Sequence, residues 1–137
     1  MFSKSNILAT ILGFVTMFLL GYAIWGVATV SFFEAHATNN IMKDPPDLIF
    51  IALGNLIGTF ALSTIYGQWA AGSYSAANGF AFGIWIGIFV GLGMGLLWYG
   101  TSELMDMTGH LVEAILDIVF YGIIGAVIGF VYQKTKR

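Results

Sequence analysis

Residues 79–95 read GFAFGIWIGIFVGLGMG, and this stretch decides the fold class. It contains no charged residue and has a glycine at every fourth position, namely Gly79, Gly83, Gly87, Gly91 and Gly95. In water, each glycine in a helix interior costs about 1 kcal/mol relative to alanine. Five of them on one helix make sense where backbones must approach closely, as in small-residue packing between membrane helices. The stretch therefore predicts a transmembrane helix that packs tightly against a neighbour.

The four-residue spacing limits what one neighbour can contact. A four-residue step overshoots a full turn of an α-helix by about 40°, so Gly79 and Gly95 should point about 160° apart. We therefore expect either a steeply crossing partner or different partners for the two halves of this span, and we expect it to be the most central or most interface-forming one. Candidate matching surfaces are the small-residue pairs Gly54 with Gly58, Gly122 with Ala126, and Gly125 with Gly129.

The composition places the whole chain in a lipid bilayer. Of its 137 residues, 58% are hydrophobic and 9% are charged, whereas soluble domains carry about 25% charged residues. The net charge of -2 and the lack of a basic run argue against nucleic acid as a partner. The absence of cysteine excludes disulfides and thiolate metal sites. We expect one transmembrane domain over residues 1–137.

Four segments are long and apolar enough to cross about 30 Å of hydrocarbon as helices. They cover about residues 6–30, 48–66, 79–99 and 111–132. The predicted fold class is therefore all-α: a polytopic membrane protein built as a four-transmembrane-helix bundle. The first apolar run, from about Ile7 to Phe33, is longer than the roughly 7 to 15 residues of a signal-peptide core. We therefore expect it to be retained as a span.

Basic residues predict the orientation in the membrane. Lys4 precedes the first predicted span, and Lys134, Lys136 and Arg137 follow the last, whereas Lys43 is the single basic residue on the other side. Because positively charged residues are enriched on the cytoplasmic side, we expect both termini to be cytoplasmic.

A weak internal similarity raises the alternative of a duplicated hairpin. When residues 12–26 are aligned with residues 86–100, Gly13, Gly21 and Gly26 coincide with three glycines of the second segment. The first and third spans run in the same direction, so a duplication would give two parallel-repeated helical hairpins. Glycine-rich spans also match by chance, and both interpretations stay open.

Polar side chains gather at the start of the fourth span. His110, Glu113 and Asp117 are spaced i, i+3, i+7 and share one helical face, which Tyr121 extends inward. Asp117 lies inside the predicted hydrocarbon layer, where a carboxylate needs a partner, neutralisation or water. Asn55, at similar depth in the second span, is the expected hydrogen-bond partner. The alternatives are an intramembrane cation or proton site and a polar contact that fixes helix register.

The same region suggests a metal site. His36, His110 and Glu113 lie on the same predicted side of the membrane, and mixed imidazole and carboxylate ligands suit divalent cations such as zinc. No His-Glu-x-x-His motif accompanies them. The alternative is that these residues are solvated groups of loops and helix starts.

The overall pattern resembles small four-span bacterial membrane proteins that are grouped as a domain of unknown function. The residues that carry the resemblance are Gly21 to Gly26 (GYAIWG), Trp98-Tyr99-Gly100 and the Gly125 to Gly129 segment. The resemblance implies a bacterial inner-membrane protein and implies no activity. Residues 55–60 (NLIGTF) are also similar to a segment of the small fluoride channels, but the chain lacks the arginine-bearing first span of that family.

These observations predict a non-enzymatic structural or accessory membrane protein. It would self-associate as a homo-oligomer or bind a larger membrane complex through its glycine-lined helix faces. The alternative is a small channel or transporter for protons, ions or metal cations that uses Asp117, Glu113 and Asn55. The sequence carries no nucleophile motif and no cofactor motif, so we expect neither catalysis nor a cofactor.

Overall fold

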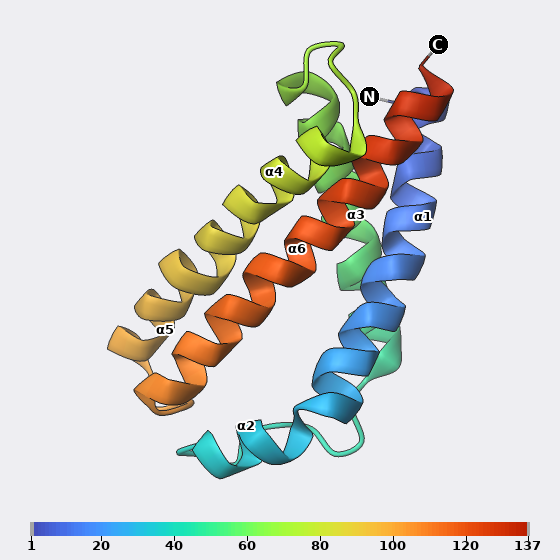
Figure 1. Cartoon of the computed structure of the whole chain (residues 1–137). Helices are drawn as coiled ribbons and strands as arrows, with labels where there is room; N and C mark the ends of the chain where they lie inside the picture. Colours follow the sequence, from blue (N-terminus) through green and yellow to red (C-terminus); the bar gives the residue numbers. More distant parts are fainter. Residues whose placement is uncertain (1, 137) are drawn as a thin grey trace.

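The chain folds as four long helices, as seen in a computed structural model that describes residues 2–136 (Figure 1). Met1 and Arg137 lie outside the described residues. The positive charge of Arg137 was used above to predict the orientation in the membrane. Within that range there is no strand, and four helical segments are long and apolar enough to cross a membrane: Lys4–Ala28, Leu48–Trp69, Ala76–Thr101 and Met107–Thr135. The predicted all-α, four-helix class is confirmed. Its spans extend by a few residues beyond several of the predicted limits.

The helices have the following bounds. The first span is α1 (Lys4–Gly21) continued by the π-helix η1 (Tyr22–Ala28), and the short α2 (Val30–His36) follows it. The second span is α3 (Leu48–Trp69). The third is α4 (Ala76–Gly87), the π-helix η2 (Ile88–Met94) and α5 (Gly95–Thr101), and the fourth is α6 (Met107–Thr135).

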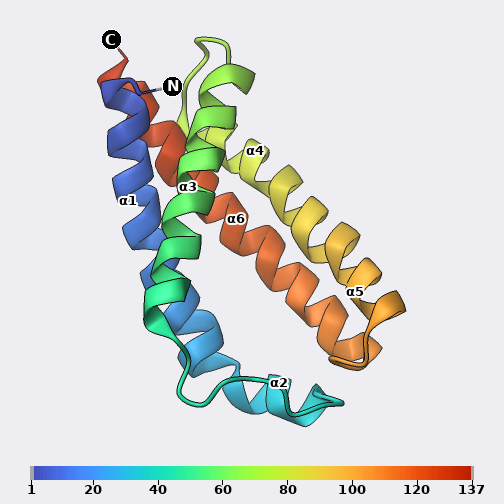
Figure 2. The same cartoon turned by 180° about the vertical axis from the view of Figure 1, so that it is seen from behind.

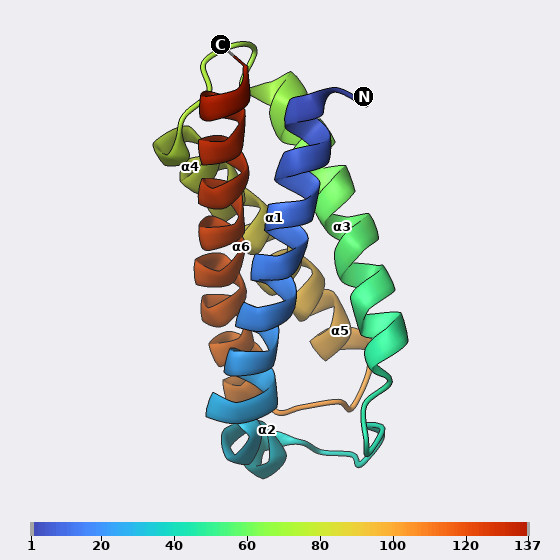
Figure 3. The same cartoon turned by 90° about the vertical axis from the view of Figure 1, so that its right-hand side faces the viewer.

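Both chain ends lie at one end of the bundle, together with the loop that joins α3 to α4 (Figures 1 and 3). We call this the terminal end and the opposite one the α2 end. Toward the α2 end, α1 and α6 diverge, and α2 lies across the space beneath them (Figures 1 and 2). The bundle is therefore closely packed at the terminal end and splayed at the α2 end.

The central helix is α6 rather than the third span. In α6, 44% of the membrane-crossing window is buried, compared with 22% in the third span and 11% in α3. It packs against α1, α2, α3, α4, η2 and α5, and Figure 1 shows it between α4 and α5 on one side and α1 on the other. The fourth span takes this position because it presents small residues to the third span and large apolar residues to α1, so that it fills the space between them.

Glycines bring α4 and α6 into backbone contact. A Cβ atom added to Gly79, Gly83 or Gly87 would lie less than 3.0 Å from backbone atoms of α6. The reverse holds for Gly125 and Gly129, whose added Cβ atoms would meet the backbones of Gly79 and Ser75. Each of these five glycines therefore stands where any side chain would push the two helices apart.

The π-helix η2 explains how one neighbour contacts most of the glycine row. In the α-helical part, each four-residue step drifts by about 40° around the axis. A π-helical turn takes more residues than an α-helical one, so the same step falls short of a full turn and the drift is reversed. Gly91, within η2, thus still faces Ala114 of α6, whereas Gly95 has no atom within 4 Å of an added Cβ. The expected steep crossing or change of partner is not needed for the first four glycines.

An aromatic cluster joins the helices at the terminal end. Tyr66 of α3 is fully buried and contacts the rings of Tyr74, Phe82 and Tyr132, with centroid distances of 5.5 to 6.1 Å. Its hydroxyl group accepts a hydrogen bond from the Ser75 N–H (3.2 Å) and donates one to the Ser75 carbonyl (3.1 Å). Tyr66 therefore ties α3 to the start of the third span and to the end of α6.

Polar contacts also join α1 to α3 near this end. The Asn6 side-chain amide donates to the Thr64 hydroxyl (3.0 Å), and the Ser63 hydroxyl donates to the Asn6 carbonyl (3.4 Å). Farther along, a Cβ on Gly13 would collide with the Thr59 methyl group. The first hairpin is thus held by small and polar side chains inside an apolar surrounding.

Candidate functional site

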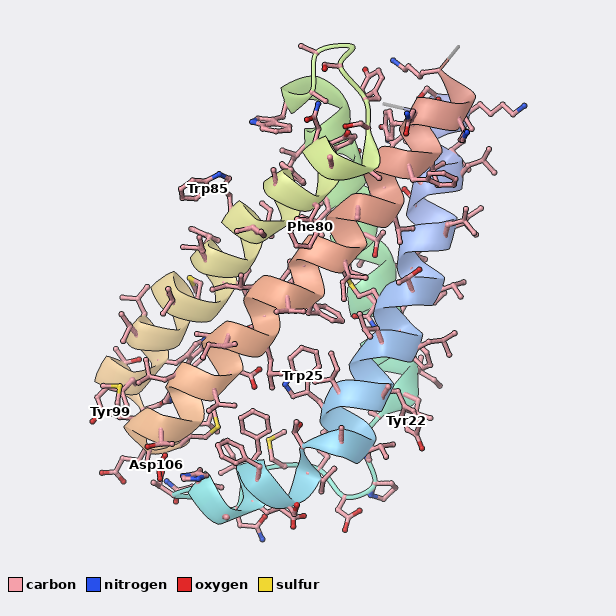
Figure 4. All side chains as sticks on the ribbon, in the orientation of Figure 1. Tyr22, Trp25, Phe80, Trp85, Tyr99 and Asp106 are labelled. Atoms are coloured by element: carbon pink, nitrogen blue, oxygen red, sulfur yellow. The ribbon has the colours of Figure 1, made fainter. Side chains whose placement is uncertain are left out.

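Acidic side chains lie between the diverging helices, in the half of α6 nearer the α2 end. The indole Nε1 of Trp25, on η1, donates a hydrogen bond of 2.9 Å to Oε2 of Glu113, on α6. The Trp25 ring also packs edge-on against Phe120, about two turns farther along α6, with centroids 5.0 Å apart. Figure 4 shows Trp25 pointing from η1 into the space between the two helices. This contact joins the two arms of the splayed bundle.

Asp117 lies one helical turn from Glu113 and is more deeply enclosed. The residue is 9% exposed, and no described residue forms a hydrogen bond or an ion pair with its carboxyl group. It occupies space that Gly91 leaves open, because a Cβ on Gly91 would come within 2.9 Å of the Asp117 Cβ. We refer to Glu113 and Asp117 as the acid pair. Tyr121, one turn beyond Asp117, is partly buried.

Asn55 does not meet Asp117. Among the described residues, the hydrogen bond of Asn55 is made by its backbone carbonyl, which accepts from the Thr59 hydroxyl (2.6 Å). The helix that carries it, α3, packs mainly on α1 and reaches α6 near the terminal end, where Tyr132 donates to the Ser63 carbonyl. Similar depth in two spans therefore does not bring the two side chains together, because α1 lies between their helices.

The three predicted metal ligands each have a different partner. His36 pairs with Asp106, His110 packs edge-on against Tyr99 at 5.7 Å, and Glu113 accepts from Trp25. Over residues 2–136, no three histidine or acidic side chains are grouped so that they could hold a metal ion. The predicted trio of His36, His110 and Glu113 is therefore wrong as a site. His110 is buried at 5% exposure, and its Nε2 has no hydrogen-bond partner among the described residues.

Residues 36–39 and 103–106 tie the two loops of the α2 end together, and we call this contact the α2 clasp. Ala37 and Met105 form an isolated antiparallel bridge, in which the Thr38 N–H donates to the Leu104 carbonyl (3.1 Å) and the Asp106 N–H donates to the His36 carbonyl (3.0 Å). The Asn39 amide donates to the Glu103 carbonyl at 2.6 Å. The clasp fixes α2 beneath the start of α6.

Asp106 holds the clasp and the helix start at the same time. Its carboxylate accepts from the Gly109 N–H (2.8 Å) as the N-cap of α6, and its other oxygen lies 2.8 Å from His36 Nδ1. The hydrogen bond from Gly109, followed by that from His36, lowers the pKa of Asp106 below its usual value of 3.8. The ionised form is therefore the one that the clasp stabilises.

We expect the clasp to be lost in strong acid and in the Asp106→Asn variant. Because the pKa of Asp106 is lower in the folded state, its contribution is complete above pH 3.8 and disappears as the pH falls through the lowered value. Hydrogen exchange of the Thr38 amide, corrected for the intrinsic pH dependence, should be several times faster in Asp106→Asn at neutral pH. The control is Glu103→Gln, since Glu103 contributes its carbonyl rather than its carboxylate. Equal protection in Asp106→Asn and wild type would show that the ionised carboxylate does not hold the clasp.

Two residues of this region were not expected from the sequence. Trp25 was not among the predicted site residues, yet its indole donates a hydrogen bond to Glu113. Asp106 reads as a loop charge, yet it caps α6 and binds His36. The available signal for Asp106 was its place immediately before the last apolar run, which is where N-caps occur.

Comparison with protein-family models, with curated proteins and with solved structures finds no match to this chain. The resemblance to small four-span bacterial membrane proteins of unknown function therefore stays a prediction.

Proposed function

We propose that this chain is a non-enzymatic structural or accessory membrane protein that self-associates through α3. Its expected place is a bacterial inner membrane with both termini in the cytoplasm, in agreement with the basic residues near the terminal end. The acidic and aromatic groups at the α2 end then face the periplasmic side.

The observation that carries this proposal is the open pair Gly54 and Gly58 on α3. An added Cβ would find no atom within 4 Å at either position, although both lie in the middle of a membrane-crossing helix. Glycines weaken a helix, and no contact among residues 2–136 compensates for these two. A G-x-x-x-G pair in an apolar span is the pattern through which transmembrane helices pair backbone to backbone.

The remaining glycine faces support the choice of α3. The row on the third span is largely occupied, because Gly79, Gly83, Gly87 and Gly91 contact α6 of the same chain. The glycine row of the third span, which was first expected to mediate self-association, therefore contacts α6 of the same chain instead. A self-complementary pair on α3 suits a symmetric dimer, in which each copy offers the same patch.

The transport alternative has less support. Beyond Tyr121, Ile124 and Ile128 of α6 are both fully buried, and Ile128 lies beside Gly13 of α1. On the side of α4, the helices touch through glycine backbones. A polar route from the acid pair to the terminal end would have to pass this apolar packing, and Asn55 does not line it.

Native mass measurement in lipid nanodiscs tests the proposal. We expect wild type to be a dimer and the Gly54→Leu, Gly58→Leu double variant to be a folded monomer, because leucine side chains would hold two α3 backbones apart. The matched control is Gly95→Leu, which places leucine at another open glycine on a different span. A monomeric wild type would contradict the proposal, as would a double variant that stays dimeric.

A further inference from the structure

The acid pair has a chemical environment that the proposed self-association does not use. Glu113 has one hydrogen-bond partner, the Trp25 indole, and Asp117 has none among the described residues although the residue is only 9% exposed. Both lie within a membrane-crossing helix, where uncompensated carboxylates are costly and point to function. A carboxyl group without a donor in this position is stabilised by a ligand that brings positive charge or a hydrogen-bond donor.

No side chain nearby supplies that charge. Among residues 2–136 the one ion pair is His36 with Asp106, in the α2 clasp. Of the elements packed on this part of α6, η1 carries Tyr22, α5 carries Tyr99, α2 carries Glu34 and His36, and α4 and η2 carry no titratable side chain. Glu34 is exposed, and His36 is paired with Asp106. Tyr22 is 61% exposed and Tyr99 packs on His110. On α6 itself, His110 and Tyr121 are the other titratable groups of this face.

The ligand set is too small for a metal ion. Magnesium requires about six ligands and calcium about six to eight oxygen ligands, whereas the described residues offer no group of three histidine or acidic side chains here. A proton requires a single carboxyl oxygen, and the second carboxylate can accept the resulting hydrogen bond. Side chains one turn apart on a helix are neighbours, so Glu113 and Asp117 are placed to share it.

Access is from one side. Glu113 is the seventh residue of α6 and Asp117 the eleventh of 29, counted from the α2 end. Toward the terminal end, the route meets the buried side chains of Ile124 and Ile128 and the glycine contacts between α4 and α6. Toward the α2 end it meets the loops that the α2 clasp holds. Apolar packing therefore closes the side of the acid pair toward the terminal end, and the α2 end is the side that remains for exchange with water.

We propose that Glu113 and Asp117 form a dead-ended proton-binding site, in which the two carboxyl groups share one proton that exchanges with the aqueous phase at the α2 end. The bound proton replaces the cationic partner that the fold lacks. Trp25 positions Glu113 through its indole hydrogen bond, and Gly91 leaves the room that Asp117 occupies. The site is independent of the dimer proposed through α3, which lies on another helix.

Infrared spectroscopy of the purified protein tests this site, because a protonated carboxyl group has a carbonyl stretch that a carboxylate lacks. The protein is held at neutral pH in a detergent without ester groups. We expect one such band in wild type, and a shift of that band in heavy water as the proton exchanges. Asp117→Asn and Glu113→Gln should each remove or displace it, and Glu34→Gln, which removes an exposed carboxyl group of α2, should leave it unchanged.

The wild-type spectrum tests the proton-binding site even where a variant folds poorly. Absence of the band would show that both carboxyl groups are ionised and would overturn the proposal, as would a band that persists in both variants or that heavy water does not shift. The oligomeric state does not enter this measurement. A monomeric protein that shows the band would support the proton-binding site and contradict the proposed dimer. A dimeric protein without the band would support the dimer and contradict the proton-binding site.

Discussion

Replacing Gly83 by alanine should destabilise the fold more than any other single methyl group added to the third span. The new Cβ would lie less than 3.0 Å from the backbone of Tyr121 and from the Gly122 Cα, and backbone atoms cannot move aside as a side-chain tip can. Overpacking costs typically about 1 to 3 kcal/mol, and the upper part of this range is expected because α4 and α6 must separate. Reversible unfolding in mixed micelles measures the loss.

Gly95→Ala is the matched control for that variant. It adds the same methyl group to the same span, at a glycine whose added Cβ would have no atom within 4 Å. No loss of stability is expected, and a small gain from helix propensity is allowed. If the two variants unfold alike, the backbone contact between α4 and α6 does not contribute to stability in the way proposed here.

The second large effect is expected at Tyr66. Tyr66→Ala removes a fully buried ring that contacts Tyr74, Phe82 and Tyr132, and large-to-small changes of aromatic core residues cost about 3 to 5 kcal/mol. Tyr66→Phe keeps the ring but removes the hydroxyl group, which leaves the Ser75 N–H without its acceptor and the Ser75 carbonyl without its donor. An unpaired buried polar group costs about 1 to 3 kcal/mol.

The same unfolding measurement separates these two contributions. The expected order of stability is wild type, then Tyr66→Phe, then Tyr66→Ala. Tyr22→Phe is the control, because it removes the hydroxyl group of a tyrosine that is 61% exposed. A Tyr66→Phe variant as stable as wild type would show that the bonds to Ser75 do not hold the third span in place.

The spans could be predicted from the sequence because length and hydropathy suffice for helices in lipid, where every backbone group must be satisfied internally. The order of helices around the centre could not. Gly79 to Gly95 indicate close packing but do not name the neighbour, and the central position of α6 depends on the fit of Ile124 and Ile128 against α1. The two π-helices were also not foreseen, and η2 changes which glycines share a face.

For the acid pair, the sequence predicts a shared helical face but not the partners. Periodicity places Glu113 and Asp117 together because both belong to one helix. Trp25, Asn55 and His36 belong to other elements, and their distances from α6 are set by helix tilt and by the path of α2. This is why the expected Asn55 contact and the metal trio fail, while the Trp25 contact was missed.

The central claim is that the glycine row of the third span is used within one chain, where it joins α4 to α6. Solid-state NMR of glycine-labelled protein in lipid bilayers tests it without any substitution. Cross-peaks are expected between the α-carbons of Gly83 and Gly122 and between those of Gly79 and Gly129, since an added Cβ at the first of each pair would lie 2.9 Å and 3.0 Å from the second. They should keep their intensity per labelled chain when labelled protein is diluted with unlabelled protein. Cross-peaks that are missing, or that fade on dilution because they arise between copies, would contradict the account.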